Sequence, residues 1–309
     1  MASANIGIFG AKPSEREEVA KAVAKKDSDA DLSYYSTIVD GCVYSVVEPT
    51  LYPEKPMPAV FAANLSDYCV FVAREPSREF AETLVLLDLL QKKKGALLTH
   101  GGLDDFLKGT VVEGYDRFDS IDGVKQAVLA FRGDSKLDSL PLACVVDNSF
   151  EVKGVGSVAL GVIRQGVLKQ YDSLFAEPGG FEVGVKSIQV HDKDVKLAYS
   201  GDRFGIGFKG ASVEQVKRGT VLSHGREETR ENSFTVTLSK FADAVEPNTV
   251  LHAVVGLQFT GCHVSEALKP GESKKAEIVF EKPVFIGGEP VLLLNLNAKK
   301  SRIVGVGRA

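Results

Sequence analysis

The sequence has no excess of basic residues. Its 37 Lys and Arg are outnumbered by 41 Asp and Glu, so the formal net charge is −4 at pH 7. A chain with this balance has no overall positive field that attracts nucleic acid. We therefore expect no binding to DNA, and any contact with RNA requires a local cluster of basic side chains.

Cysteines and long apolar runs are also scarce. The 4 cysteines lie far apart, at Cys42, Cys69, Cys144 and Cys262, and no pair has the spacing of a zinc or redox site. This pattern predicts reduced thiols and no metal site. No stretch approaches the roughly 18 apolar residues of a membrane span, and no signal peptide is recognisable. These absences predict a soluble cytoplasmic protein without a membrane partner.

Residues 1–135 alternate strand-like and helix-like segments, an order typical of a parallel sheet flanked by helices. The first helix is predicted to begin at Ser14, with Ser14 as its N-cap and Glu17 at capping-box spacing. The predicted elements are strands at Ile6–Phe9, Tyr68–Ala73 and Gly95–Thr99, and helices at Ser14–Val23, Ser77–Gln91 and Gly123–Phe131.

The pattern changes at the polar linker Arg132–Lys136. From Pro141 onward, short runs rich in Val, Ile and Phe alternate with turns that contain Gly or Asp, which indicates barrels or sandwiches. A second polar seam falls at Ser223–Glu228. We therefore predict a fold of the α/β plus all-β class, with an α/β domain at 1–135 and two β-barrels at 137–225 and 228–309.

Five segments of the middle region follow one another in an order that resembles the second domain of elongation factor Tu. They are Phe150–Gly161, Gly166–Asp172, Val185–His191, Ala198–Gly205 and Lys217–Leu222. Their glycines suit the sharp bends of a small barrel. Three later segments are similar to the third domain of that factor: Leu268–Glu272, Phe280–Val284 and Ile303–Gly307.

The chain thus resembles the translational GTPase superfamily. Its Asp202–Arg203 pair and its loose third domain resemble the selenocysteine-specific elongation factor more than elongation factor Tu itself. The resemblance implies that the first domain descends from a GTPase that binds GTP and Mg²⁺. It also implies tRNA or the ribosome as a partner.

The residues of the first domain contradict nucleotide binding. A P-loop has the pattern G-x-x-x-x-G-K-[ST], whose amides and lysine hold the phosphates. Counted from Gly10, this chain places Glu15 at the second glycine, Arg16 at the lysine and Glu17 at the hydroxyl residue, and Pro13 removes an amide donor. A carboxylate about 4 Å from a phosphate repels it by a few kcal/mol.

The other nucleotide motifs are missing too. No D-x-x-G occurs at residues 55–75, and no N-K-x-D occurs anywhere in the chain. We therefore predict a degenerate P-loop GTPase-like domain, without catalytic residues, bound GTP or Mg²⁺, or GTP hydrolysis. Gly10 is then an ordinary turn glycine.

Two groups of residues are candidates for binding aminoacyl-tRNA, at positions that contact tRNA in the family. Asp147, Phe150 and Arg203 belong to the second domain, and an acid and an arginine that face one pocket suit an aminoacyl group. The alternative interpretation is a surface ion pair and a core phenylalanine. The third domain adds a basic cluster that suits phosphates, made of Lys299, Lys300 and Arg302.

Two functions from different classes remain. The first is a translation-factor paralogue that binds tRNA or the ribosome without hydrolysing GTP. The second is a scaffold that uses the same fold to bind another protein. An active GTP-binding factor is the least favoured, because the nucleotide motifs are defective.

Overall fold

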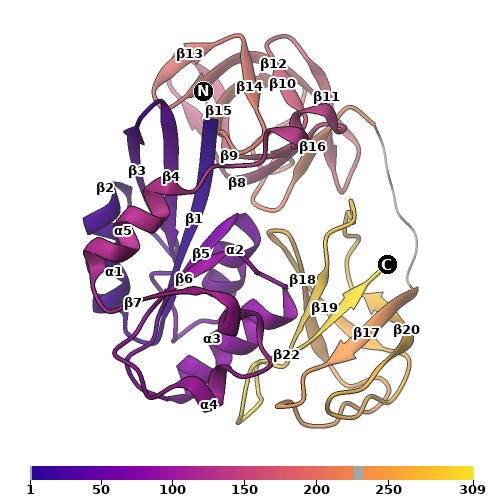
Figure 1. The fold of residues 1–309 in the computed structure, drawn as a ribbon. Coiled ribbons are helices and arrows are strands. Elements are labelled where there is room, and N and C mark those ends of the chain that lie inside the picture. The colour runs from indigo at the N-terminus through magenta and orange to yellow at the C-terminus, as the bar shows by residue number, and fades with distance from the viewer. Residues whose placement is uncertain (1, 226–232) are drawn as a thin grey trace.

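The computed structural model describes residues 2–225 and 233–309. These residues form an α/β domain followed by two β-barrels (Figure 1), which confirms the predicted fold class. The third region is described from Ser233 onward, so the predicted boundary at residue 228 lies outside the described residues.

The first domain is built on one sheet with the strand order β2-β3-β4-β1-β5-β6-β7. Its strands are β1 (Ala2–Gly10), β2 (Lys25–Ser28), β3 (Ser33–Val39), β4 (Cys42–Glu48), β5 (Tyr68–Val72), β6 (Gly95–Leu98) and β7 (Asp116–Phe118). The pairs from β4 through β1, β5 and β6 to β7 are parallel, as predicted. The edge strand β2 and its neighbour β3 pair in antiparallel fashion, and β3 pairs in the same way with β4. None of these three strands was predicted.

Helices cover both faces of this sheet. They are α1 (Pro13–Val23), α2 (Met57–Leu65), α3 (Arg78–Leu89), α4 (Asp104–Leu107) and α5 (Ile121–Ala130), with short 3₁₀ turns at Val111–Gly114 and Ser135–Ser139. Ile6 and Ile8 of β1 pack in one apolar cluster with α1 and α5, and Phe9 packs in another with α2 and α3. Because side chains alternate along a strand, one apolar run supplies both layers of the core.

The start of α1 differs from the prediction. Lys12 is the N-cap, Pro13 is in the first turn, and Ser14 lies inside the helix. The predicted capping box at Ser14 is therefore wrong, because Pro13 has no N–H to be capped and its fixed backbone angle starts the helix earlier. In α3, by contrast, the Oγ of Ser77 accepts a hydrogen bond from the backbone N–H of Phe80.

The second domain is a closed barrel. The ring β11-β16-β8-β9-β15-β12 closes through the pairing of β11 with β12. Two short strands, β10 and β14, pair beside it. The strands are β8 (Ala143–Val152), β9 (Gly156–Gln165), β10 (Val167–Lys169), β11 (Ser173–Glu177), β12 (Phe181–Val190), β13 (Lys193–Val195), β14 (Leu197–Tyr199), β15 (Arg203–Lys209) and β16 (Val221–Ser223).

The third domain is also a closed barrel, with the order β17-β20-β19-β18-β21-β22. Inward-facing side chains of each barrel form a separate apolar core. The strands of this barrel are β17 (Ser233–Leu238), β18 (Leu251–Val255), β19 (Gln258–Val264), β20 (Ser273–Phe280), β21 (Val291–Leu294) and β22 (Ile303–Arg308).

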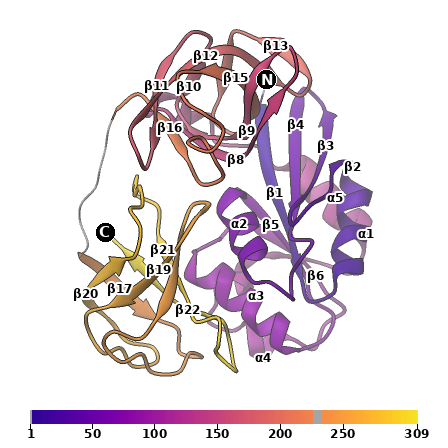
Figure 2. The same cartoon turned by 180° about the vertical axis from the view of Figure 1, so that it is seen from behind.

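The three domains pack against one another. The start of β1 reaches the second domain, and β22 lies beside α3 (Figures 1 and 2). One apolar cluster runs from the α2 and α3 side of the first domain to Val145 in the second and Val254 in the third. Apolar burial therefore contributes to the interfaces as well as to each core.

The cysteines, membrane spans and metal-binding groups considered in the sequence can now be compared with the structure. All four cysteines are free and buried. Within residues 2–225 and 233–309, no helix is long and apolar enough to cross a membrane. Among the same residues, no group of three or more His, Cys, Asp or Glu side chains is arranged to hold a metal ion.

Candidate functional site

The connection between β1 and α1 consists of only two residues. β1 ends at Gly10 and α1 begins at Pro13. Glu15, Arg16 and Glu17 therefore all lie in the helix, with no wide loop before them to surround a phosphate. A Cβ on Gly10 would lie 2.7 Å from the carbonyl oxygen of Val72. This close approach to β5 gives the glycine a structural role.

Arg16 fills the space that this short connection leaves. Its side chain is fully buried. The guanidinium donates hydrogen bonds to the backbone oxygens of Gly10 at 2.7 Å, Pro49 at 2.9 Å and Tyr52 at 2.7 Å. Its Nε pairs with Glu48 at 3.3 Å. The end of β1 is thus tied to the segment after β4 by a protein cation.

Burial shapes the ionisation of this pair. Burial lowers the pKa of Arg16, and the attraction of Glu48 opposes that effect. Burial also raises the pKa of Glu48, although Arg16 pulls it back. Because a buried charge is costly without a partner, each member of the pair depends on the other.

The two glutamates of the degenerate motif do not converge on one point. Glu15 lies 3.8 Å from Lys12 and 3.8 Å from Arg74. Glu17 pairs with Lys21 at 2.9 Å and with Lys26 at 3.4 Å on the outer side of α1. The hydrogen bonds from both lysines lower the pKa of Glu17. The end of β1 is therefore occupied by the side chain of Arg16. The predicted repulsion between Glu15 or Glu17 and a phosphate is less important there.

Arg302 lies at the interface between the first and third domains. It forms a two-pronged ion pair with Glu82 of α3, with N–O distances of 2.6 and 3.0 Å. It also donates to the backbone oxygens of Pro53 at 2.9 Å and Glu54 at 3.2 Å. Glu82 is 1% exposed. The interpretation of Arg302 as a free phosphate ligand is wrong, because α3 and the 53–54 segment already take up its donors.

The other two basic candidates of the third domain are on the surface. Lys299 is exposed. Lys300 is exposed as well and pairs with Asp243 at 2.7 Å. The carbonyl oxygen of Lys300 accepts a hydrogen bond from Arg78 of the first domain, so the backbone at this turn belongs to the same interface.

Asp147 and Arg203 do come together. They form an ion pair at 2.8 Å, and Asp147 is 2% exposed. The guanidinium of Arg203 lies 3.5 Å from the ring centre of Tyr34, which belongs to β3 of the first domain. Burial opposes the charge of Arg203, but Asp147 and Tyr34 outweigh it and raise its pKa. Phe150 is exposed. The alternative of a surface ion pair and a core phenylalanine is therefore wrong.

A cleft of about 500 Å³ adjoins this ion pair. One wall comes from β2, β3 and β4 of the first domain, and the other from β9, β12 and β15 of the second. Arg203, Tyr34, Lys25 and Lys26 line it. The first-domain wall was not predicted, because the edge hairpin carries no motif and only the tertiary structure places it opposite Arg203.

No family model matches the sequence. An uncharacterized protein of Methanocaldococcus jannaschii is 28% identical over the whole of both chains. The selenocysteine-specific elongation factor of the same organism is 25% identical over 99% of this chain and 79% of its own length. That alignment extends over 378 residues, more than the 309 of this chain, so parts of the longer protein have no counterpart here.

Solved structures give the same picture. A bacterial selenocysteine-specific elongation factor superposes with a TM-score of 0.84 at 16% identity, over 100% of this chain and 58% of the other. The elongation factor SelB of Methanococcus maripaludis, in complex with the GTP analogue GPPNHP, gives 0.81 at 19% identity. This chain has the translational elongation-factor fold. It is similar to the selenocysteine-specific elongation factor in sequence and in structure.

Proposed function

We propose that this elongation-factor-like protein binds tRNA or the ribosome through its barrels, and that it neither binds nor hydrolyses GTP. The proposal places the protein in the cytoplasm. One observation carries the nucleotide part: the buried guanidinium of Arg16 bonds to Gly10, Pro49 and Tyr52 at the end of β1.

In a GTPase, the γ-phosphate and its Mg²⁺ order the switch segments, and hydrolysis releases them. Here Arg16 performs the ordering from inside the chain, since it joins the end of β1 to the segment that follows β4. An internal side chain is not consumed, so this clamp stays closed through every binding cycle.

The same segment continues the link to the third domain. Tyr52 accepts from Arg16, and the next two residues, Pro53 and Glu54, accept from Arg302. Two arginines thus hold one short stretch of chain from opposite sides. In this proposal they keep the third barrel fixed against the first domain without any nucleotide.

The partner class rests on the resemblance and on local chemistry. A relative over 99% of this chain carries the name of a selenocysteine-specific elongation factor. The net charge of −4 cannot attract RNA as a whole. The contacts must therefore come from local groups, of which exposed Lys299 and Lys300 and the cleft beside Arg203 are the candidates.

Nucleotide binding is tested by titrating the full chain with a fluorescent GDP or GTP analogue in the presence of Mg²⁺. We expect no saturable binding. A dissociation constant at or below about 1 μM, typical of a specific site, would overturn this part of the proposal.

RNA binding is tested by filter binding of aminoacylated and bare tRNA, and of ribosomes, with and without GTP. The affinity should not change with nucleotide. When Lys299 and Lys300 are replaced with alanine, the slope of log affinity against log salt should become shallower. The change should be roughly one unit for each phosphate contact removed. If the intact protein binds neither RNA nor ribosomes at low salt, the protein-scaffold alternative takes its place.

A further inference from the structure

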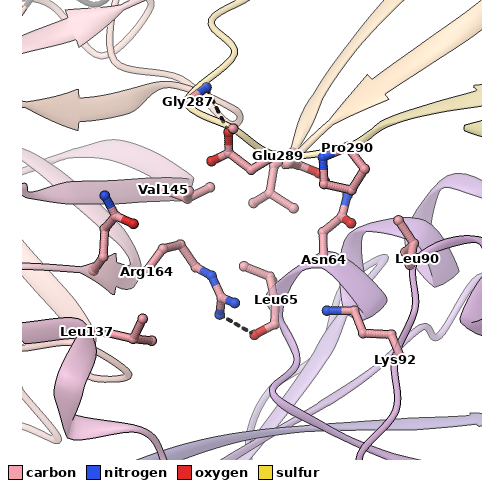
Figure 3. A pocket seen from close by; sticks show the side chains of 14 residues that line it. Asn64, Leu65, Leu90, Lys92, Leu137, Val145, Arg164, Gly287, Glu289 and Pro290 are labelled. Carbon is pink, nitrogen blue, oxygen red and sulfur yellow. Dashed lines mark hydrogen bonds between the residues drawn. The ribbon is translucent and has the colours of Figure 1, made fainter. Parts of the chain in front are cut away.

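A cavity of about 370 Å³ lies where the three domains meet. Its walls come from the end of α2 and the turn after α3 in the first domain, from β8 and β9 in the second, and from two turns of the third (Figure 3). The volume is in the range of small-molecule sites, which are frequent at domain interfaces.

Two cationic side chains project into this cavity from different domains. Figure 3 shows Lys92 and Arg164 reaching toward its centre from opposite walls. The Nζ of Lys92 donates to the backbone oxygen of Ser66 at 2.9 Å. Among the described residues this is its one hydrogen-bond acceptor, whereas an ammonium group has three donors. Lys92 therefore has donors left for a ligand in the cavity.

Two carboxylates, of Asp67 and Glu289, lie near these cations. Asp67 accepts from Arg164 at 3.1 Å and from Asn5 at 3.0 Å. Glu289 accepts from the backbone N–H of Gly287 at 2.8 Å. Burial lowers the pKa of Lys92, and the repulsion of Arg164 lowers it further against the opposing pull of Cys69 and Asp67. Asp67 therefore balances the charge of Arg164, whereas Lys92 has no ion-pair partner among the described residues, and an anion in the cavity would supply one.

The rest of the lining mixes apolar and polar side chains. The cavity is lined by five aliphatic side chains, Leu65, Leu90, Leu137, Val145 and Leu257, and by the polar Asn64, Gln165 and Glu289. Little of these side chains is exposed, at 2–8% for Leu65, Leu90, Val145 and Leu257. An apolar ligand body would cover what remains, at about 25 cal/mol for each Å² of apolar surface removed from water.

We propose that this cavity binds a small organic anion. Its carboxylate or phosphate head lies between Lys92 and Arg164, and its apolar body packs on Leu90, Val145 and Leu257. The ligand touches all three domains, so its binding stabilises their assembled arrangement by mass action. This site is separate from the end of β1 and from the tRNA candidates, and its test is independent of both.

The test uses 2-naphthoate and 2-naphthyl phosphate as probes of the two head groups, with neutral 2-naphthol and inorganic phosphate as controls. Calorimetric titration of the full chain should show one saturable site for at least one naphthyl anion. In a separate thermal unfolding experiment, the same anion should raise the midpoint temperature of unfolding. Both controls should bind at least about tenfold more weakly, because each lacks half of the interaction. Equal binding of 2-naphthol, or no anion binding tighter than about 1 mM, would overturn the proposal.

Three variants locate the site. Lys92→Met removes the charge and keeps the stem, and it should weaken anion binding by about tenfold or more. Leu137→Trp should block the cavity while both cations remain. Lys108→Met, at an exposed lysine outside the cavity, is the matched control and should bind normally. Circular dichroism confirms that each variant is folded. Unchanged affinity in folded Lys92→Met or Leu137→Trp would show that the anion binds elsewhere.

Discussion

Replacing Arg16 with methionine tests the internal clamp directly. The change keeps the aliphatic length but removes a guanidinium that contacts Gly10, Pro49 and Tyr52. It also leaves the Glu48 carboxylate buried without its partner, at 3% exposure. Breaking a buried ion pair in this way costs about 3–5 kcal/mol. That is a large part of the 5–15 kcal/mol that stabilises an ordinary domain.

The sign of the pH dependence is a second, sharper test. The pKa of Glu48 is already raised by burial, so its folded form binds a proton more tightly than the unfolded chain does. Stability therefore falls as pH rises from the unfolded pKa through the folded one. Loss of Arg16 removes the group that pulls this pKa down. The loss of unfolding free energy caused by Arg16→Met should thus be smaller near pH 5 than near pH 8.

The assay is urea unfolding followed by far-ultraviolet circular dichroism, with Arg74→Met as a matched control. Arg74 is exposed and lies 3.8 Å from Glu15, and such surface pairs contribute roughly 0–1 kcal/mol. Glu48→Gln added to Arg16→Met should recover part of the loss at the higher pH. The reasoning would be refuted if Arg16→Met lost no more unfolding free energy than Arg74→Met. It would also be refuted if the loss did not grow with pH.

Three further outcomes are expected. Arg302→Met leaves Glu82 buried without a partner, so thermal unfolding should split into separate transitions as the third barrel detaches, whereas Lys300→Met at the exposed pair should keep the wild-type profile. A single wild-type transition in Arg302→Met would mean that apolar packing alone holds this interface. Asp147→Asn should destabilise the protein by about 3–5 kcal/mol in urea, because Arg203 loses its buried counter-ion; a loss of unfolding free energy below about 1 kcal/mol would mean that the Asp147–Arg203 pair is exposed to solvent. Arg203→Ala should reduce the preference for aminoacylated over bare tRNA while the salt slope stays nearly unchanged, as measured by filter binding.

Local pattern was enough to predict the fold class. Apolar runs such as Ile6–Phe9 and the segments of the first barrel are short, buried and bounded by turn residues. Their periodicity follows from the backbone geometry of a strand, which is a local property. The same reasoning missed β2, because Lys25–Ser28 are polar, largely exposed residues without an apolar run. It also missed β3 and the fully buried β4.

The sequence also showed by itself that Arg16 stands where a P-loop has lysine, because a motif is a matter of spacing along the chain. Only the tertiary structure decided what each charged residue does. Arg16, Arg203 and Arg302 are all buried or half-buried partners of carboxylates from other segments of the chain. A cation takes its role from whatever lies opposite it, and in this protein that is set by how the strands and domains pack.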